Sequence, residues 1–137
     1  MIKLETLKPG QRIELSGAPP GLDARALATF ATAGRDVLHI AREASRTAQL
    51  IESLAFFAPD IQALEFPAWD CLPYDRVSPV AEIVSRRIDT LTTLAAGAAP
   101  KGGRIVVTTI NAILQRVPPR SMFTTAGFAA EVGTELK

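Results

Sequence analysis

The sequence predicts a doubly wound α/β fold, in which helices cover both faces of a parallel sheet. Strand-like and helix-like patterns alternate four times along the chain. The helical segments are long enough to cross over such a sheet with right-handed connections. Between two of these units, residues 66–79 hold three prolines and the chain's only Trp, Tyr and Cys. That composition excludes a regular helix or central strand and predicts a rigid loop.

The first half of the chain contains two strand patterns and two helix patterns. Residues 12–15 alternate polar and apolar, which predicts a first strand. Helical spacing of apolar residues, an acidic first turn and a following glycine predict a helix over residues 22–33. Residues 37–40 are almost wholly apolar, as is typical of a strand covered on both faces. Ser45 is expected to cap the second helix, which ends at Pro59.

The second half continues the alternation. Residues 61–66 are expected to form the third strand. Ser78 is a candidate helix cap, and Pro79 would then occupy the first helical position, where its missing N–H costs nothing. The resulting helix has an apolar face more than four turns long and ends at Gly97. Its length makes it the clearest helix signal in the chain.

The remaining residues are expected to complete the sheet and to begin a second structural unit. Residues 98–103 are expected to form a flexible turn, followed by a β-branched strand over 104–108. A short helix over 109–115 would be stopped by two prolines. Residues 128–136 resemble the first strand and turn of another unit. We therefore predict an α/β domain over residues 1–120 and the incomplete start of a second subdomain over 121–137.

Composition limits the classes of function. The 137 residues suffice for one domain with a core that needs no disulfide or metal. A net charge of +1 gives no reason for the whole surface to bind nucleic acid strongly. One Cys, the lack of a long apolar run and a start unlike a signal peptide predict a soluble protein of the reduced cytoplasm, with no membrane contact.

The loop and the helix after it carry a specific family resemblance. The pattern is Trp-Asp, then Leu-Pro-Tyr-Asp, then Ser-Pro, then a helix bearing an arginine. Its residues are Trp69, Asp70, Leu72, Pro73, Tyr74, Asp75, Ser78, Pro79 and Arg87. The pattern resembles the N-terminal module of the bacterial transcription-repair coupling factors (Mfd), which is itself similar to the excision-repair protein UvrB. The resemblance extends from about residue 15 to residue 117.

This resemblance implies a fold like that of P-loop NTPases and of domain 1a of UvrB. It also implies that a full-length protein would be an ATP-dependent DNA translocase that displaces stalled RNA polymerase and recruits UvrA for nucleotide excision repair. ATP, Mg²⁺ and DNA would bind the downstream motor. The present residues would serve as a scaffold and protein-interaction surface that helps to keep the UvrA-recruiting subdomain hidden. The UvrA contacts would lie mostly in the subdomain that begins here.

The first βα turn shows why no nucleotide is expected in this part of the protein. A phosphate-binding loop has Gly, any four residues, Gly-Lys, and then Ser or Thr. Counted from Gly17, the last three positions hold Leu22, Asp23 and Ala24. Asp23 places a negative charge where the cation belongs, and two prolines remove N–H donors. We therefore predict a degenerate loop comprising Gly17, Gly21, Asp23 and Ala24, with no catalytic residue and no cofactor.

Other candidate sites have simpler structural explanations. His39 is expected to be a core or edge histidine, because no second His or Cys accompanies it as a metal ligand. Cys71 is expected to be a structural thiol. The span 66–79 is too short for the DNA-inserting hairpin of UvrB. Trp69 and Tyr74 could stack on a base, but packing against the core is favoured.

The role of the loop itself is open between a structural plug at the sheet edge and a surface that contacts a partner. Asp75 is expected to pair with Arg87 across the junction of loop and helix. Four further arginines are expected to be a solvated face, although a basic patch is the alternative. These are Arg76, Arg86, Arg116 and Arg120. Two other functions also remain open: a nucleotide-binding ATPase fragment and a weak module for single-stranded DNA.

Overall fold

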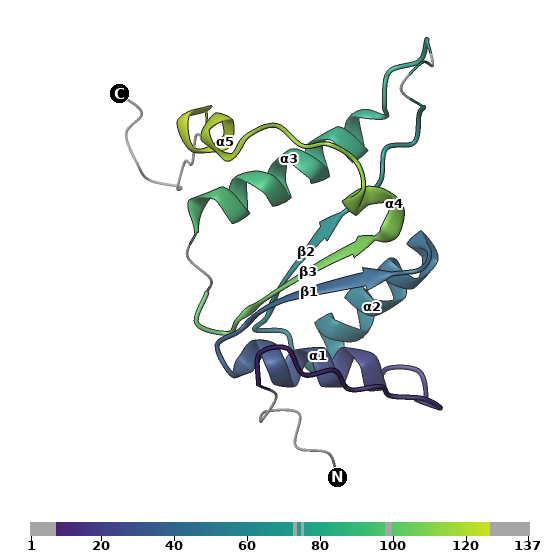
Figure 1. The fold of residues 1–137 in the computed structure, drawn as a ribbon, viewed down its shortest axis with the longest axis vertical. Helices are drawn as coiled ribbons and strands as arrows, with labels where there is room; N and C mark the ends of the chain where they lie inside the picture. The colour runs from purple at the N-terminus through teal and green to yellow at the C-terminus, as the bar shows by residue number, and fades with distance from the viewer. Residues whose placement is uncertain (1–7, 73, 75, 98–99, 127–137) are drawn as a thin grey trace.

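A sheet of parallel strands lies at the centre of the computed structural model, which describes residues 8–72, 74, 76–97 and 100–126. Its strands are β1 (Asp36–Ala41), β2 (Gln62–Phe66) and β3 (Arg104–Thr109), in the spatial order β1-β3-β2 (Figure 1). The register places Leu38 of β1 and Leu64 of β2 on either side of Val106. The last strand in sequence therefore occupies the middle of the sheet.

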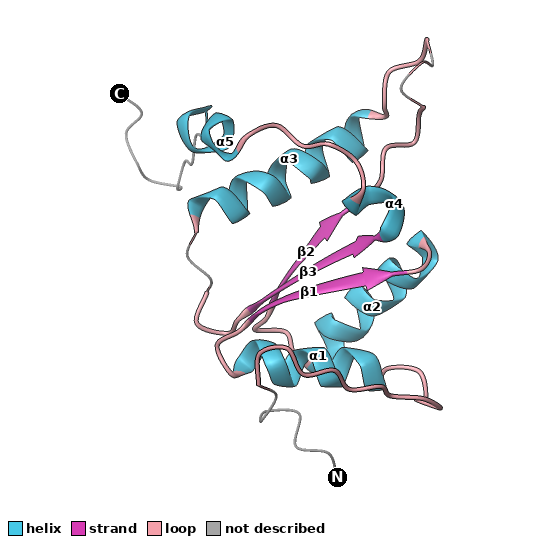
Figure 2. Cartoon of the chain, in the orientation of Figure 1, coloured by secondary structure: helices cyan, strands magenta, loops and turns pink. Residues whose placement is uncertain are grey.

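Helices cover both faces of this sheet, as Figure 2 shows. α1 (Leu22–Thr32) and α2 (Ala44–Phe57) lie on one face, and α3 (Ala81–Ala96) and α5 (Arg120–Ala126) lie on the other. The single turn α4 (Ile110–Ile113) follows β3. The chain crosses from one edge to the other through α2 and returns to the middle through α3. Crossovers of one hand must use opposite faces when the direction reverses, so the arrangement is compatible with the predicted doubly wound α/β fold.

The main hydrophobic core lies between the sheet and the pair α1 and α2. The buried positions of α1 are alanines, which allow this helix to approach the sheet closely. Leucines from α2 and β-branched residues from β3 fill the rest. The core residues are Ala24, Ala28, Ala31, Leu50, Leu54, Ile61, Ile105 and Val107. The central position of β3 explains why Ile105 and Val107 have no exposed surface.

Residues 12–15 do not form the predicted strand. All four are exposed, and the sheet of the described residues contains no strand from this segment. Alternating polarity favours a strand only where a sheet edge can accept its backbone groups, and this segment has no such partner in the structure. The described residues therefore contain three strands where four were predicted.

The prediction that both faces of β1 are covered is also wrong. Leu38 and Ile40 are 54% and 45% exposed, and both lie on the face of the sheet that carries α3. β1 is an edge strand, and α3 packs against β2 at the other edge. An apolar run indicates a strand but cannot say how far a helix from elsewhere extends over it.

Two of the predicted helix starts differ from the structure. α2 begins at Ala44 after Glu43, so Ser45 lies inside the helix and does not cap it. α3 begins at Ala81, so Ser78 is not its cap and Pro79 precedes its first turn. The C-terminal end of α3 is predicted better than its start. Gly97 has a φ of 89° immediately after α3, a conformation that favours glycine.

The end of the described chain contains a helix that the sequence did not reveal. α5 follows the two prolines directly and packs against α3 (Figure 1). Its shortness and mixed polarity leave no clear helical periodicity to detect. The strand predicted over 128–136 lies outside the described residues, and the division of the chain after residue 120 stays a prediction. Within the described part of the chain, no helix has the length and hydropathy required to span a bilayer.

Candidate functional site

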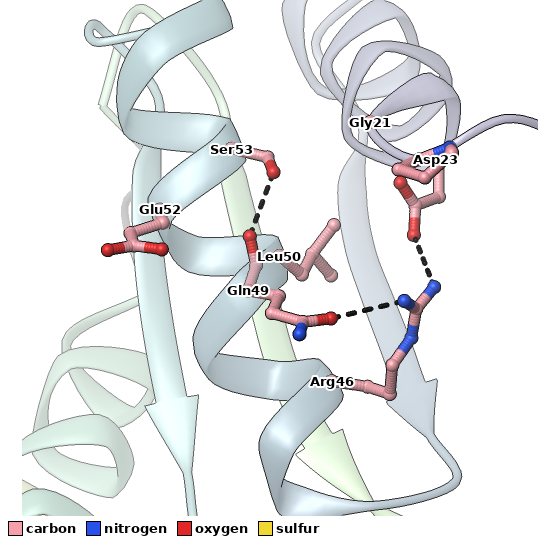
Figure 3. A pocket seen from close by; sticks show the side chains of 8 residues that line it. Gly21, Asp23, Arg46, Gln49, Leu50, Glu52 and Ser53 are labelled. Carbon is pink, nitrogen blue, oxygen red and sulfur yellow. Dashed lines mark hydrogen bonds and ion pairs between the residues drawn. The ribbon is translucent and has the colours of Figure 1, made fainter.

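The segment predicted to be a degenerate phosphate loop borders a pocket between α1 and α2. The pocket has a volume of about 410 Å³, with Gly21 and Asp23 on one side and Arg46, Gln49 and Glu52 of α2 on the other (Figure 3). α1 begins at the same end of the sheet as the carboxyl ends of the strands (Figure 1). That is the position at which α/β proteins of this topology bind ligands.

Hydrogen bonds within the chain occupy two of the first three N–H groups of α1. The N–H of Leu22 donates to the carbonyl oxygen of Pro19 at 3.2 Å, and that of Ala24 donates to Oδ1 of Asp23 at 2.9 Å. A phosphate bound at a helix N-terminus would need such donors to be free. The side chain of Ala24 is fully buried in the core, at the position where a phosphate-binding loop has its hydroxyl.

The charges around this pocket largely neutralise one another. Oδ2 of Asp23 lies 3.7 Å from Nη2 of Arg46, and both side chains are about half exposed. Nη1 of Arg46 also donates to the amide oxygen of Gln49 at 3.1 Å (Figure 3). Glu52 also lines the pocket, but its carboxylate points away from Asp23 and Arg46 (Figure 3). The cation that reaches the pocket therefore comes from α2 and already has partners.

His39 lies near the same charges. It is half-buried in β1, and burial lowers its pKa below the usual value of 6.5, because the charged imidazolium loses hydration. Asp23 opposes that shift and Arg46 adds to it. Among the described residues, no group of three His, Cys, Asp or Glu side chains is suited to holding a metal ion. Cys71 is a half-buried free thiol.

The base of the 66–79 loop is fixed around Arg87. Its guanidinium carbon lies 4.1 Å from the ring centroid of Phe66 and 4.2 Å from that of Trp69. Nη1 donates to the carbonyl oxygen of Pro67 at 2.6 Å and to Oε1 of Gln115 at 3.1 Å. The same Oε1 accepts the backbone N–H of Trp69 at 3.0 Å. Gln115 thus joins the loop, α3 and the segment after α4 in one network.

Arg87 is held without a carboxylate among these partners. Its side chain is only 2% exposed, and burial lowers its pKa from the usual arginine value. Two aromatic faces and two neutral oxygens compensate for the lost hydration. Asp75, the predicted partner of Arg87, lies outside the described residues, so that pairing stays a prediction. Pro73 also lies outside them.

The remainder of the loop is exposed. Both carboxylate oxygens of Asp70 lie 3.3 Å from the backbone nitrogen of Val80, and this hydrogen bond closes the neck of the loop. Beyond the neck, Leu72 is 70% and Tyr74 is 97% exposed. The packing expected of Tyr74 is therefore wrong, whereas Trp69 packs on Arg87. The base of the loop is thus fixed and its projecting part exposes Leu72 and Tyr74, whereas contact with a partner stays a prediction.

The four arginines of the predicted solvated face have different surroundings. Arg86 forms ion pairs with Glu65 and Glu82. Arg120 donates to the carbonyl oxygen of Ala95 at 2.9 Å. Arg116 borders a cavity that Arg87 also lines, and Arg76 is exposed on the loop. The sequence did not reveal the roles of Gln115 and Phe66, because their contacts with Arg87 depend on residues far apart in the chain.

Comparison with known proteins confirms the resemblance seen in the loop motif. The transcription-repair-coupling factor of Rickettsia bellii is 32% identical over 89 residues, which are 65% of this chain and 8% of the relative. Those of Rickettsia prowazekii and Haemophilus influenzae are 37% identical over 75 residues and 29% identical over 112 residues, covering 55% and 82% of this chain. The matched residues span less than a tenth of the length of these relatives. No protein-family model and no solved structure matches the chain.

Proposed function

We propose that this chain is a non-catalytic, UvrB-like module of a transcription-repair coupling factor. In a full-length protein it would be a scaffold and a protein-contact surface that helps to keep the UvrA-recruiting subdomain hidden. The motor that binds ATP and DNA and displaces RNA polymerase would lie downstream. The likeness to transcription-repair-coupling factors supports the assignment to this class of protein.

The state of the degenerate phosphate loop carries the non-catalytic part of this proposal. Two N–H groups at the start of α1 have acceptors within the chain. Asp23 faces the pocket where a lysine would be required, and the one arginine that reaches it is paired with Asp23. Bound phosphate would have to break these contacts and overcome the repulsion of Asp23. These features favour a fold that has the shape of a nucleotide site without its binding groups.

Titration of the chain with ATP and Mg²⁺ in a calorimeter tests this point. We expect no binding at micromolar concentrations of nucleotide. Micromolar affinity that is lost in Arg46→Glu, which reverses the charge of the arginine in the pocket lining, would contradict the proposal and favour an ATPase fragment.

The exposed tip of the loop carries the contact-surface part of the proposal. In a full-length protein, we expect Leu72→Ser together with Tyr74→Ser to increase UvrA binding in the absence of ATP, because the change removes apolar surface from the contact that hides the recruiting subdomain. Pull-down or surface plasmon resonance measures this binding. The matched control is Phe56→Ser, which alters an aromatic residue that is 80% exposed on α2. Unchanged UvrA binding in the loop variant would contradict the autoinhibitory role.

A weak single-stranded DNA module is the second candidate, and the near-complete exposure of Tyr74 is the observation that favours it. The ring of Trp69 is less suitable for base stacking, because the guanidinium of Arg87 covers it. Oligonucleotide binding that depends on Tyr74 and weakens with salt would support this candidate over the scaffold.

A further inference from the structure

A hydrophobic groove follows α3 where the segment of residues 116–123 lies beside it. Two cavities of about 380 Å³ and 320 Å³ make up this groove. They are neighbours, because Leu91, Val117, Pro118 and Phe123 line both of them. We call this feature the α3–α5 groove. Ile88 and Met122 in its lining are 50% and 59% exposed, so apolar surface of the groove faces solvent in the described structure.

The groove exists because the apolar residues of α3 do not all face the sheet. The positions of α3 buried on the sheet side include the polar residues Arg87 and Thr90, and Oγ1 of Thr90 donates to the carbonyl oxygen of Glu65 at 2.6 Å. Ile88 and Leu91 lie beside these positions and line the larger cavity together with residues of the segment that leads into α5. An exposed apolar strip of this kind on a small domain indicates an interaction site.

The charged residues that line the groove are all arginines. Among the described residues, Arg87 and Arg116 border the larger cavity and Arg120 borders the smaller one, with no Asp or Glu in either lining. The guanidinium of Arg87 is almost completely buried, and both of its hydrogen bonds given above use Nη1. Arg116 is exposed at the rim. The groove thus combines an apolar lining with charged side chains that are all positive.

We propose that the α3–α5 groove binds an acidic amphipathic peptide segment of a partner protein. Apolar side chains on one face of the segment would replace water along α3, and its carboxylates would meet the exposed Arg116 and Arg120. Arginine suits this role because its planar guanidinium binds carboxylates through paired hydrogen bonds. A nucleic acid fits less well, because the lining is mainly aliphatic and the ring of Trp69 is stacked on Arg87. This inference goes beyond the proposed function and does not depend on the loss of nucleotide binding.

Trp69 allows the proposal to be tested without a label, because it lines the groove and is the only Trp of the chain. The probe is a capped synthetic peptide of about 15 residues, roughly four helical turns, with Leu on one face and Glu beside it. The matched peptide carries Gln in place of each Glu. We expect the acidic peptide to shift the Trp69 emission and to bind about tenfold more tightly than the neutral one, with the difference reduced by salt.

Charge reversal at the rim tests where the peptide binds. We expect Arg116→Glu to weaken binding of the acidic peptide about tenfold, because attraction to the carboxylates becomes repulsion. Arg25→Glu is the matched control, since Arg25 is an exposed arginine of α1 on the opposite face of the sheet and should leave binding unchanged. Both variants keep the network around Arg87 intact, so loss of folding should not confuse the result.

Several outcomes would overturn the proposal. These are failure of the acidic peptide to bind, equal binding of the acidic and neutral peptides, and equal effects of Arg116→Glu and Arg25→Glu. Tighter binding of a thymidine oligonucleotide that Arg116→Glu abolishes would assign the groove to nucleic acid. A Trp69 emission that changes with protein concentration, together with a dimer mass, would assign it to a second copy of the chain. None of these results depends on ATP titration, so the two proposals can fail separately.

Discussion

Replacing Arg87 with Ala is expected to destabilise the protein by about 3 kcal/mol or more. The change removes a cation that lies between the rings of Phe66 and Trp69. It also leaves the carbonyl of Pro67 without this donor and opens a cavity beneath the loop. Urea denaturation followed by the fluorescence of Trp69 measures the loss. The emission of the folded variant should also shift, because the ring loses its partner.

Arg86 provides a control on the same helix. It has ion pairs with Glu65 and Glu82, but its side chain is about half exposed. Arg86→Ala should therefore cost less than about 1 kcal/mol, as is usual for solvated ion pairs. Arg87→Lys should fall between the two, since it keeps the charge but loses the planar stacking. Equal costs for Arg87→Ala and Arg86→Ala would show that the buried network contributes little to stability.

The second large effect is expected at Gly103, where Gly103→Ala should cost about 3 kcal/mol. Gly103 has a φ of 89°, which an L-residue adopts only with strain. An added Cβ would also lie 2.3 Å from the carbonyl oxygen of Ala31, so the end of α1 would have to move. Urea denaturation of the variant measures the combined cost. The neighbouring Gly102 is similarly close to Asp60, so the end of the predicted flexible turn is tightly packed.

Gly34 separates the two causes. It also has a positive φ, of 79°, but a Cβ there would meet nothing within 4 Å. Gly34→Ala should therefore show only the backbone cost, about 1 kcal/mol. If Gly34→Ala and Gly103→Ala cost the same, the close approach of the turn to α1 would have no energetic role.

Sequence patterns predicted the main elements because each of these patterns is local. The helices over residues 22–33 and after the Ser-Pro pair were found within a few residues of α1 and α3. The central strand β3 was found from its β-branched run. The cap of α3 was predicted less well. The N–H of Val80 donates to the carboxylate of Asp70 across the neck of the loop. A local hydroxyl such as that of Ser78 is then not needed.

The two parts of the candidate site, the phosphate loop and the network around Arg87, also differed in how well the sequence predicted them. The spacing from Gly17 to Ala24 was enough to predict that the phosphate loop lacks its cation and hydroxyl. The network around Arg87 was not predictable, since Gln115 lies 28 residues further along the chain and nothing near it indicates the contact. Arg116 and Arg120 were expected to be a solvated face, and only the packing of α5 places them along an apolar groove.

By itself, the sequence determined the order of the helices α1, α2 and α3 and of the strands β1, β2 and β3, together with the family motif, because each is written in neighbouring residues. Only the tertiary structure decided which strands lie at the sheet edges, which arginine is buried and which loop residues project into solvent. Those outcomes depend on which distant segments pack together, and burial of a side chain is a property of that packing. For this reason Arg87 is enclosed while Arg86, the residue just before it in the chain, is about half exposed.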